Sequence, residues 1–199
     1  MVLALSLFVG FMLLSVVYAS MLEWWIHKHW MHTPKFLYQA FDRHQLQHHS
    51  ARKSLKRFYL RPPEVAEYKF TESSFMPWLF VIHLPMFALI GWLFTWPAAV
   101  GFMLGSGTYL LLYELLHWAM HVPRPHWVYN VRYFQYISEL HRIHHYRAWQ
   151  NYNVVMPIAD FLLRTLNHDW LPPEPAINVL EEEERAAKRK DKQLVESGK

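Results

Sequence analysis

The chain contains no cysteine, and this absence limits the chemistry it can host. Without cysteine there is no disulfide, no thiolate nucleophile, no iron–sulfur cluster and no cysteine-ligated zinc or haem. A bound metal must therefore rely on nitrogen and oxygen ligands. The 14 histidines among the 199 residues make imidazole nitrogen the obvious candidate. The sequence also lacks a dinucleotide-binding glycine fingerprint, a P-loop and a fused electron-carrier domain.

Charged side chains are missing from long stretches of the chain. Residues 1–22 contain none, and the apolar run continues to Ile26 with only Glu23 interrupting it. About 20 apolar residues suffice for a helix to cross the ~30 Å hydrocarbon core of a bilayer. A cleaved signal peptide is the alternative, with Val17-Tyr18-Ala19 as its cleavage site, but no Lys or Arg precedes the run. We therefore expect a first transmembrane helix here.

A second apolar region, residues 75–116, has about twice the length of one span. Thr95-Trp96-Pro97 in its middle predicts a tight turn between two helices, residues 76–95 and 98–116. Small residues allow helices to approach closely in a membrane, and Gly101, Gly105 and Gly107 supply them. A soluble helical protein with a buried hairpin is the alternative, but 24.0 kDa offers too little polar surface to bury such helices.

The charges between the first and second spans predict the orientation. Nine Lys or Arg lie there against four acids, whereas the turn at residues 95–98 has no charge. By the positive-inside rule this loop and the C-terminal region are cytosolic, and the N-terminus lies outside. Anionic lipid headgroups, rather than nucleic acid, are the natural partner of these bases.

The sequence thus predicts an all-α integral membrane protein. It has three transmembrane helices, with four as the alternative, and a cytosolic helical cap that carries the histidine clusters. Residues 1–171 form the membrane-embedded domain, and residues 172–199 form a charged, solvated tail.

Ten of the histidines fall into four clusters, all near span ends or in the predicted cytosolic segments. They are His27 and His32; His44, His48 and His49; His117 and His121; and His141, His144 and His145. Folding the spans together brings these clusters to one side of the membrane. Ten imidazoles exceed the four to six ligands of one metal, whereas two neighbouring metals could use them all. Imidazole suits iron, zinc, copper and nickel, so the ligands alone do not select the element.

The spacing of the last two clusters suits an α-helix. Residues four apart lie one above the other, as His117 and His121 do. The last cluster spans an arc of about 100°, so its three imidazoles are expected to converge on one point. The five-residue steps from His27 to His32 and from His44 to His49 amount to about 140° on an ideal helix, so a helix end or bend is expected there.

Three polar residues could support the ligands. Glu23 precedes His27 by one turn, and Glu114 precedes His117 by three residues, so each carboxylate could accept a ring N–H. Asn151 could assist a metal-bound water. Three of the remaining histidines are expected to contact headgroups or the membrane interface: His29, His126 and His168. The fourth is His83. That residue is expected to hydrogen-bond the backbone beside Pro85, with cavity lining as the alternative.

Four motifs resemble the fatty acid hydroxylase and sterol desaturase superfamily of histidine-rich membrane diiron oxygenases. They read EWWIHKHWMH, HQLQHH, YELLHWAMH and HRIHHYRAWQNYNVVMPIADFLLRTL, in the family's order. The last includes a proline, Asp160 and Thr165 in the positions of the family's closing motif. Two departures are the three-residue gap between His44 and His48, where two are frequent, and Asn153, where glycine is usual.

The resemblance implies that all ten clustered histidines ligate two iron ions, although purified protein could carry zinc. It implies a monooxygenase that uses O2 and electrons from a separate reductase to hydroxylate a C–H bond of a fatty-acyl or related lipid. A desaturase and a carotenoid-ring hydroxylase on the same centre are alternatives. Two alternatives belong to other classes of protein: a bis-histidine haem electron carrier and a zinc-binding membrane protein.

Overall fold

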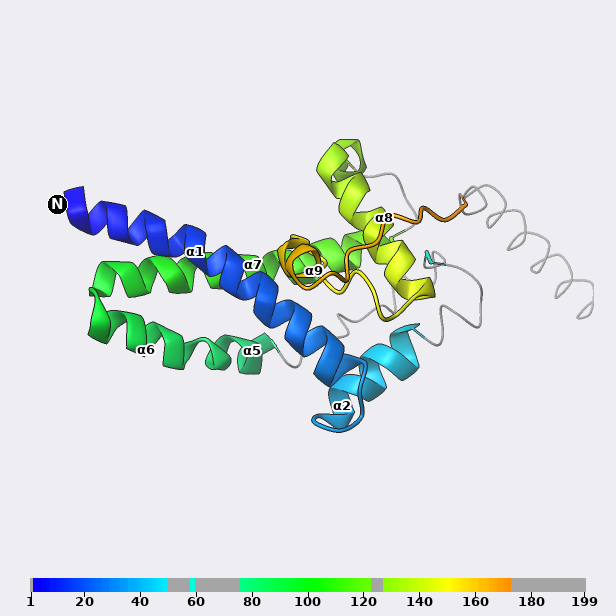
Figure 1. Ribbon diagram of the computed structural model, residues 1–199, viewed down its shortest axis with the longest axis horizontal. Helices are drawn as coiled ribbons and strands as arrows, with labels where there is room; N and C mark the ends of the chain where they lie inside the picture. The colour runs from blue at the N-terminus through cyan, green and yellow to red at the C-terminus, as the bar shows by residue number, and fades with distance from the viewer. Residues whose placement is uncertain (1, 50–57, 60–75, 123–126, 173–199) are drawn as a thin grey trace, which may run out of the picture.

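The structure is a computed structural model that describes residues 2–49, 58–59, 76–122 and 127–172 (Figure 1). Every regular element in these ranges is a helix, which confirms the all-α prediction. The elements are α1 (Val2–Ile26), η1 (His27–Met31), α2 (Tyr38–Phe41), η2 (Asp42–His49), α5 (Met76–Ile82), α6 (Leu84–Leu93), α7 (Trp96–His121), η3 (Trp127–Asn130), α8 (Arg132–Tyr146) and α9 (Ile158–Leu162). His126, the tail beyond Pro172 and six of the nine bases of the first loop lie outside the described residues.

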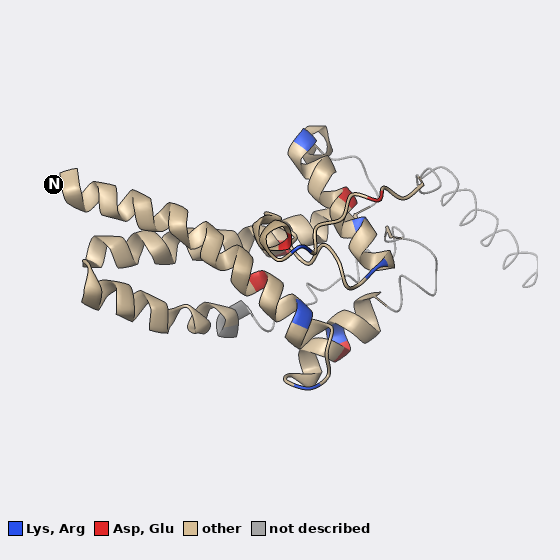
Figure 2. Cartoon of the chain, viewed as in Figure 1, with Lys and Arg blue, Asp and Glu red and all other residues tan. Residues whose placement is uncertain are grey.

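Helices α1, α6 and α7 form an apolar bundle at one end of the molecule. Figure 2 shows no charged residue on the part of the bundle nearest the N-terminus, while the charges gather toward α2 and α8. Its apolar side chains face outward, with Leu3 73%, Trp92 81% and Leu111 66% exposed. Outward apolar surface of this kind is typical of helices in lipid rather than of a soluble core.

Two helices are long and apolar enough to cross a membrane: Val2–Met31, which is α1 continued by η1, and α7. They are compatible with membrane insertion. The second predicted span, residues 76–95, differs from expectation, because its apolar helix, Leu79–Leu93, is shorter and breaks at His83. Pro85 explains the break, since it sits in the first turn of α6 and lacks a backbone N–H. Helix α7 runs five residues beyond the predicted end, to His121.

The predicted hairpin between α6 and α7 is present. Thr95 is the N-cap of α7, and its hydroxyl oxygen accepts the backbone N–H of Ala98 at 3.4 Å. Pro97 follows in the first turn, where the missing N–H costs nothing. The turn at residues 94–95 thereby returns the chain along α6 (Figure 1).

Glycines allow close packing, but chiefly against α1 rather than α6. A Cβ on Gly101 would lie 2.1 Å from the carbonyl oxygen of Phe8, and a Cβ on Gly105 would lie 2.2 Å from Oγ of Ser15. Gly107 faces Phe80 with ordinary spacing. The two long helices thus cross with their backbones nearly touching, as small residues permit.

Candidate metal centre

Ten histidine side chains meet where η1, η2, α7 and α8 come together. They form two sets in which the ligand nitrogens all lie within 4.8 Å of one another: His27, His32, His44, His49 and His144; and His48, His117, His121, His141 and His145. We call these the His27 set and the His48 set. All ten side chains are buried except His32, which is partly buried. The sets contain the ten predicted ligands and no other residue.

Helix periodicity builds most of the His48 set. His117 and His121 are one turn apart at the end of α7, and His141 and His145 are one turn apart on α8. The Nε2 atoms of His121 and His141 are 3.2 Å apart, and those of His141 and His145 are 3.1 Å apart. His48 completes the set, with its Nε2 at 3.2 Å from that of His117.

The first two clusters reach the centre by a different local structure from the one predicted. Instead of a helix end or bend, η1 and η2 are π-helices. In a π-helix the hydrogen bond runs from residue i+5 to residue i, and the N–H of His32 donates to the carbonyl of His27 at 3.1 Å. Residues five apart therefore lie nearly above one another. This geometry brings His27 and His32 together, and likewise His44 and His49, and it places His44 in the set despite its unusual spacing.

The ring orientations show that the sets fit metal ions. The Nδ1–H of His27 donates to the carbonyl of Tyr152, and that of His144 donates to the carbonyl of Gln150 at 2.7 Å. A neutral ring that donates from Nδ1 has only a lone pair on Nε2. The amide oxygen of Gln45 accepts from Nδ1 of His32 in the same way.

The lone pairs therefore face each other across short distances. Nε2 of His32 lies 3.0 Å from Nε2 of His144, although both atoms are acceptors. Two acceptors at this separation repel unless a cation lies between them. Nitrogens about 2.1 Å from one ion, at right angles, would be about 3.0 Å apart, so the separations match a shared metal.

Burial keeps these imidazoles neutral. Loss of solvation lowers the pKa of His32 to about 4. For six other histidines, loss of solvation and repulsion from neighbouring imidazoles together lower the pKa well below the usual value. They are His44, His48, His49, His141, His144 and His145. Neutral imidazole is the form that ligates a metal.

Two of the three predicted supporting residues, Glu23 and Asn151, bond to partners other than those expected. Glu23 accepts hydrogen bonds from Tyr109 Oη at 2.6 Å and Asn153 Nδ2 at 2.9 Å, and does not receive the ring N–H of His27. Glu114 is buried on α7, one turn before His117. Asn151 holds the backbone instead of facing the metal centre, because its side chain bonds Leu140 and Asn167.

The groups that orient the rings are not those expected from the sequence. Three of them are Gln45 and the carbonyls of Gln150 and Tyr152. A fourth is the carbonyl of Phe58, which accepts from Nδ1 of His121 at 3.0 Å. Gln45 beside the histidine cluster was the one detectable signal, since backbone carbonyls carry no sequence signature.

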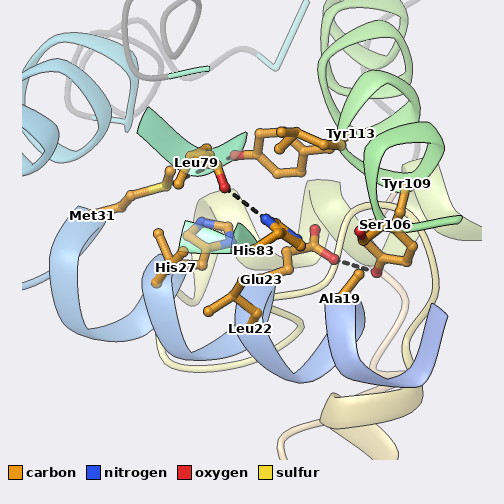
Figure 3. A pocket seen from close by; sticks show the side chains of 12 residues that line it. Ala19, Leu22, Glu23, His27, Met31, Leu79, His83, Ser106, Tyr109 and Tyr113 are labelled. Carbon is orange, nitrogen blue, oxygen red and sulfur yellow. Dashed lines mark hydrogen bonds between the residues drawn. The ribbon is translucent and has the colours of Figure 1, made fainter. Parts of the chain in front are cut away.

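A narrow cavity reaches the His27 set from the apolar bundle (Figure 3). The surface exposed to the cavity is almost wholly apolar, and the lining comes from α1, η1, α5, α7 and His83 at the break between α5 and α6. His27 and Met31 are among the lining residues. His83 lines it while its Nδ1–H donates to the carbonyl of Leu79 at 2.7 Å, so both alternatives weighed for His83 hold. A hydrocarbon segment suits this lining.

The match to known proteins agrees with this geometry. The family model for fatty acid hydroxylases matches residues 12–165, which include both histidine sets. The chain belongs to the fatty acid hydroxylase family. This membership confirms the resemblance drawn from the motifs and makes the protein a hydroxylase-type oxidoreductase. No curated protein and no solved structure matches.

Proposed function

We propose that this protein is a membrane-bound diiron monooxygenase that hydroxylates a C–H bond of a fatty-acyl or related lipid. The observation that carries the proposal is the pair of adjacent five-histidine sets in a chain of the fatty acid hydroxylase family. The His27 set would hold one iron ion and the His48 set the other. Iron, when bound there, supplies the redox chemistry that activates O2.

Each set would supply five nitrogen donors. Five nitrogen donors fall within the four to six ligands that one metal takes. The sets adjoin each other, since the rings of His49 and His145 stack at 4.1 Å with 12° between their planes, one ring from each set. Two ions held this close could act on one O2 molecule.

The cavity supports an apolar substrate. His27, a proposed iron ligand, lines the cavity at the end where Met31 lies, so a hydrocarbon segment there would sit beside one metal (Figure 3). The work of the protein is to hold one C–H bond at that end and to exclude water. Leu79 of α5 and Leu110 of α7, which both line the cavity, would pack against such a segment.

The membrane orientation is part of the proposal. The apolar bundle would lie in the bilayer with the N-terminus outside, and the histidine sets would lie at the cytosolic face. There a separate reductase or electron carrier could deliver electrons.

Lipid analysis tests the proposal. Lipid extracts of cells that express the wild-type chain should contain a species heavier by one oxygen than in cells without it. Loss of two hydrogens instead would identify a desaturase. Cells expressing His145→Ala should lack the new species, whereas His29→Ala should retain it, because His29 belongs to neither set. An unchanged lipid profile with iron-loaded protein, reductase and O2 present would contradict the proposal.

The haem alternative is disfavoured by geometry. A porphyrin must lie between its two axial histidines, but here each ring has several other imidazoles around it. His32, for example, has the rings of His27, His44, His49 and His144 with centroids at 4.7–5.0 Å. An absorption spectrum without a Soret band is the expected result.

A further inference from the structure

The segment after α8 contacts the back of the His27 set. Residues 151–153 run beside η1, and the carbonyl of Tyr152 accepts the Nδ1–H of His27. This bond fixes the tautomer of His27 and directs its Nε2 to the other nitrogens, 2.8 Å from Nε2 of His44. The position of one peptide group therefore decides whether His27 faces the set.

Asp160 holds that peptide group. Its Oδ1 accepts the backbone N–H of Tyr152 at 3.0 Å, and its Oδ2 accepts the backbone N–H of Asn153 at 2.7 Å. The carboxylate is fully buried. The backbone N–H of Asp160 donates in return to Oδ1 of Asn153 at 3.1 Å.

The carboxylate is itself fixed to α1. Thr165 Oγ1 donates to Oδ1 of Asp160 at 2.6 Å and accepts the indole N–H of Trp24 at 2.8 Å. Trp24 lies three residues before His27 on the same helix. Two routes thus connect Asp160 to that helix, one through Thr165 and Trp24 and one through the Tyr152 peptide to the imidazole.

We propose that Asp160 is a positioning residue for the metal ion of the His27 set, acting through the Tyr152 peptide and the ring of His27. This inference rests on the proposed two-metal function. Within the described part of the chain, the side-chain bonds of Asp160 go to Tyr152, Asn153 and Thr165, none of which belongs to the His48 set. Its loss should therefore weaken one site and spare the other.

The test uses Asp160→Asn in the full chain, purified in detergent, stripped of metal and titrated with Co²⁺. The amide keeps one acceptor oxygen but places NH2 against one of the two backbone N–H donors. Loss of partners beyond the ligands costs about 10- to 100-fold in metal affinity. We expect wild-type protein to bind two Co²⁺ ions tightly and Asp160→Asn to bind about one, with the second weakened to that degree.

Two further variants separate positioning from folding. Thr165→Val removes only the hydroxyl bonds and should weaken the same site by a smaller factor. If Asp160 acts through His27, then Asp160→Asn added to His27→Ala should change Co²⁺ binding no further than His27→Ala alone. Asp169→Asn is the matched control, because this exposed carboxylate contacts Arg147 instead.

The outcomes are distinct. Two tightly bound ions in Asp160→Asn, or equal weakening of both sites in Asp160→Asn and Thr165→Val, would overturn the inference. A wild-type chain that binds fewer than two ions would instead contradict the proposed diiron centre. Circular dichroism of each variant verifies that the helices are retained. If Asp160→Asn does not fold, the site-selective loss in Thr165→Val decides the matter.

Discussion

His144 and His145 are neighbours in the chain, yet they belong to different histidine sets. Nε2 of His144 lies 3.0 Å from that of His32, whereas Nε2 of His145 lies 3.1 Å from that of His48. The two side chains leave α8 in different directions, because consecutive residues on an α-helix point about 100° apart. His48 and His49 divide between the sets in the same way. Two adjacent pairs thus force the two sites to lie side by side.

This division predicts the metal content of single variants. His144→Ala should lose the ion of the His27 set, and His145→Ala should lose that of the His48 set, leaving about one ion each. Hydroxylation should fall by more than about 100-fold in both, since even an outer partner is worth 10- to 100-fold. Metal analysis of the purified protein measures the number of bound ions, and the yield of hydroxylated lipid measures the activity. His29→Ala, whose ring packs on Trp24 and Trp25, should keep both ions.

The two sites should differ in how tightly they hold metal. In the His27 set, three rings have a hydrogen-bond partner on Nδ1, namely His27, His32 and His144. In the His48 set, His121 has such a partner, but Nδ1 of His141 and of His145 has none within the described part of the chain. Rings held by such bonds are better oriented and more basic ligands.

Metal removal by a chelator should therefore proceed in two phases. The ion of the His48 set should leave first, and an affinity difference of about 10-fold or more is expected. In His144→Ala the slow phase should be lost, and in His145→Ala the fast one. A single phase that accounts for both ions would contradict the difference.

Side-chain spacing indicated from the sequence how four of the five members of the His48 set pair, but it grouped His144 with His141 and His145, whereas the structure places His144 in the His27 set. His117, His121, His141 and His145 follow the period of a regular α-helix, so their shared faces needed no tertiary information. The five-residue steps were correctly seen as irregular, but a π-helix replaced the expected bend. The 3.6-residue period does not describe π-helices, which depend on a local change of hydrogen-bond partner.

The supporting groups were not predictable in the same way. Asn151 has a φ of 53°, and this left-handed residue helps direct the following peptide toward His27. Such a path depends on contacts with residues far along the chain, such as Thr165, whose carbonyl accepts the N–H of Asn151 at 3.0 Å. Glu23 was misplaced for the same reason, because its partners on α7 and at residues 153–154 are distant in sequence.

The crossing of α1 and α7 predicts a strong effect of one methyl group. In Gly101→Ala the new Cβ would lie 2.1 Å from the carbonyl oxygen of Phe8 and 2.9 Å from its carbon, so backbone must shift. We expect a loss of about 1–3 kcal/mol in the free energy of unfolding, typical of overpacking. Gly10→Ala is the control, since nothing lies within 4 Å of its Cβ, and the change should be neutral or stabilising by about 0.5–1 kcal/mol. Denaturation in mixed detergent compares the two, and equal stabilities would refute the close crossing.

The buried imidazoles predict how stability depends on pH in the metal-free protein. Unfolded histidine has a pKa of about 6.5, whereas burial lowers the pKa of His32 to about 4 and that of His44 and His141 well below the usual value. Between these values the unfolded chain binds protons that the folded chain does not. The free energy of unfolding should therefore be highest above pH 6.5 and fall as the pH drops toward 4.

Thermal unfolding between pH 8 and pH 4.5 measures this dependence, with metal-loaded protein for comparison. A bound ion stabilises the fold only while the imidazoles are neutral, so the advantage of the loaded protein should shrink over the same range. If the thermal unfolding temperature of the metal-free protein stayed constant between pH 6.5 and 4.5, the imidazoles would take up protons in the folded state as easily as in the unfolded one. They could not then be buried as two sets of neutral ligands.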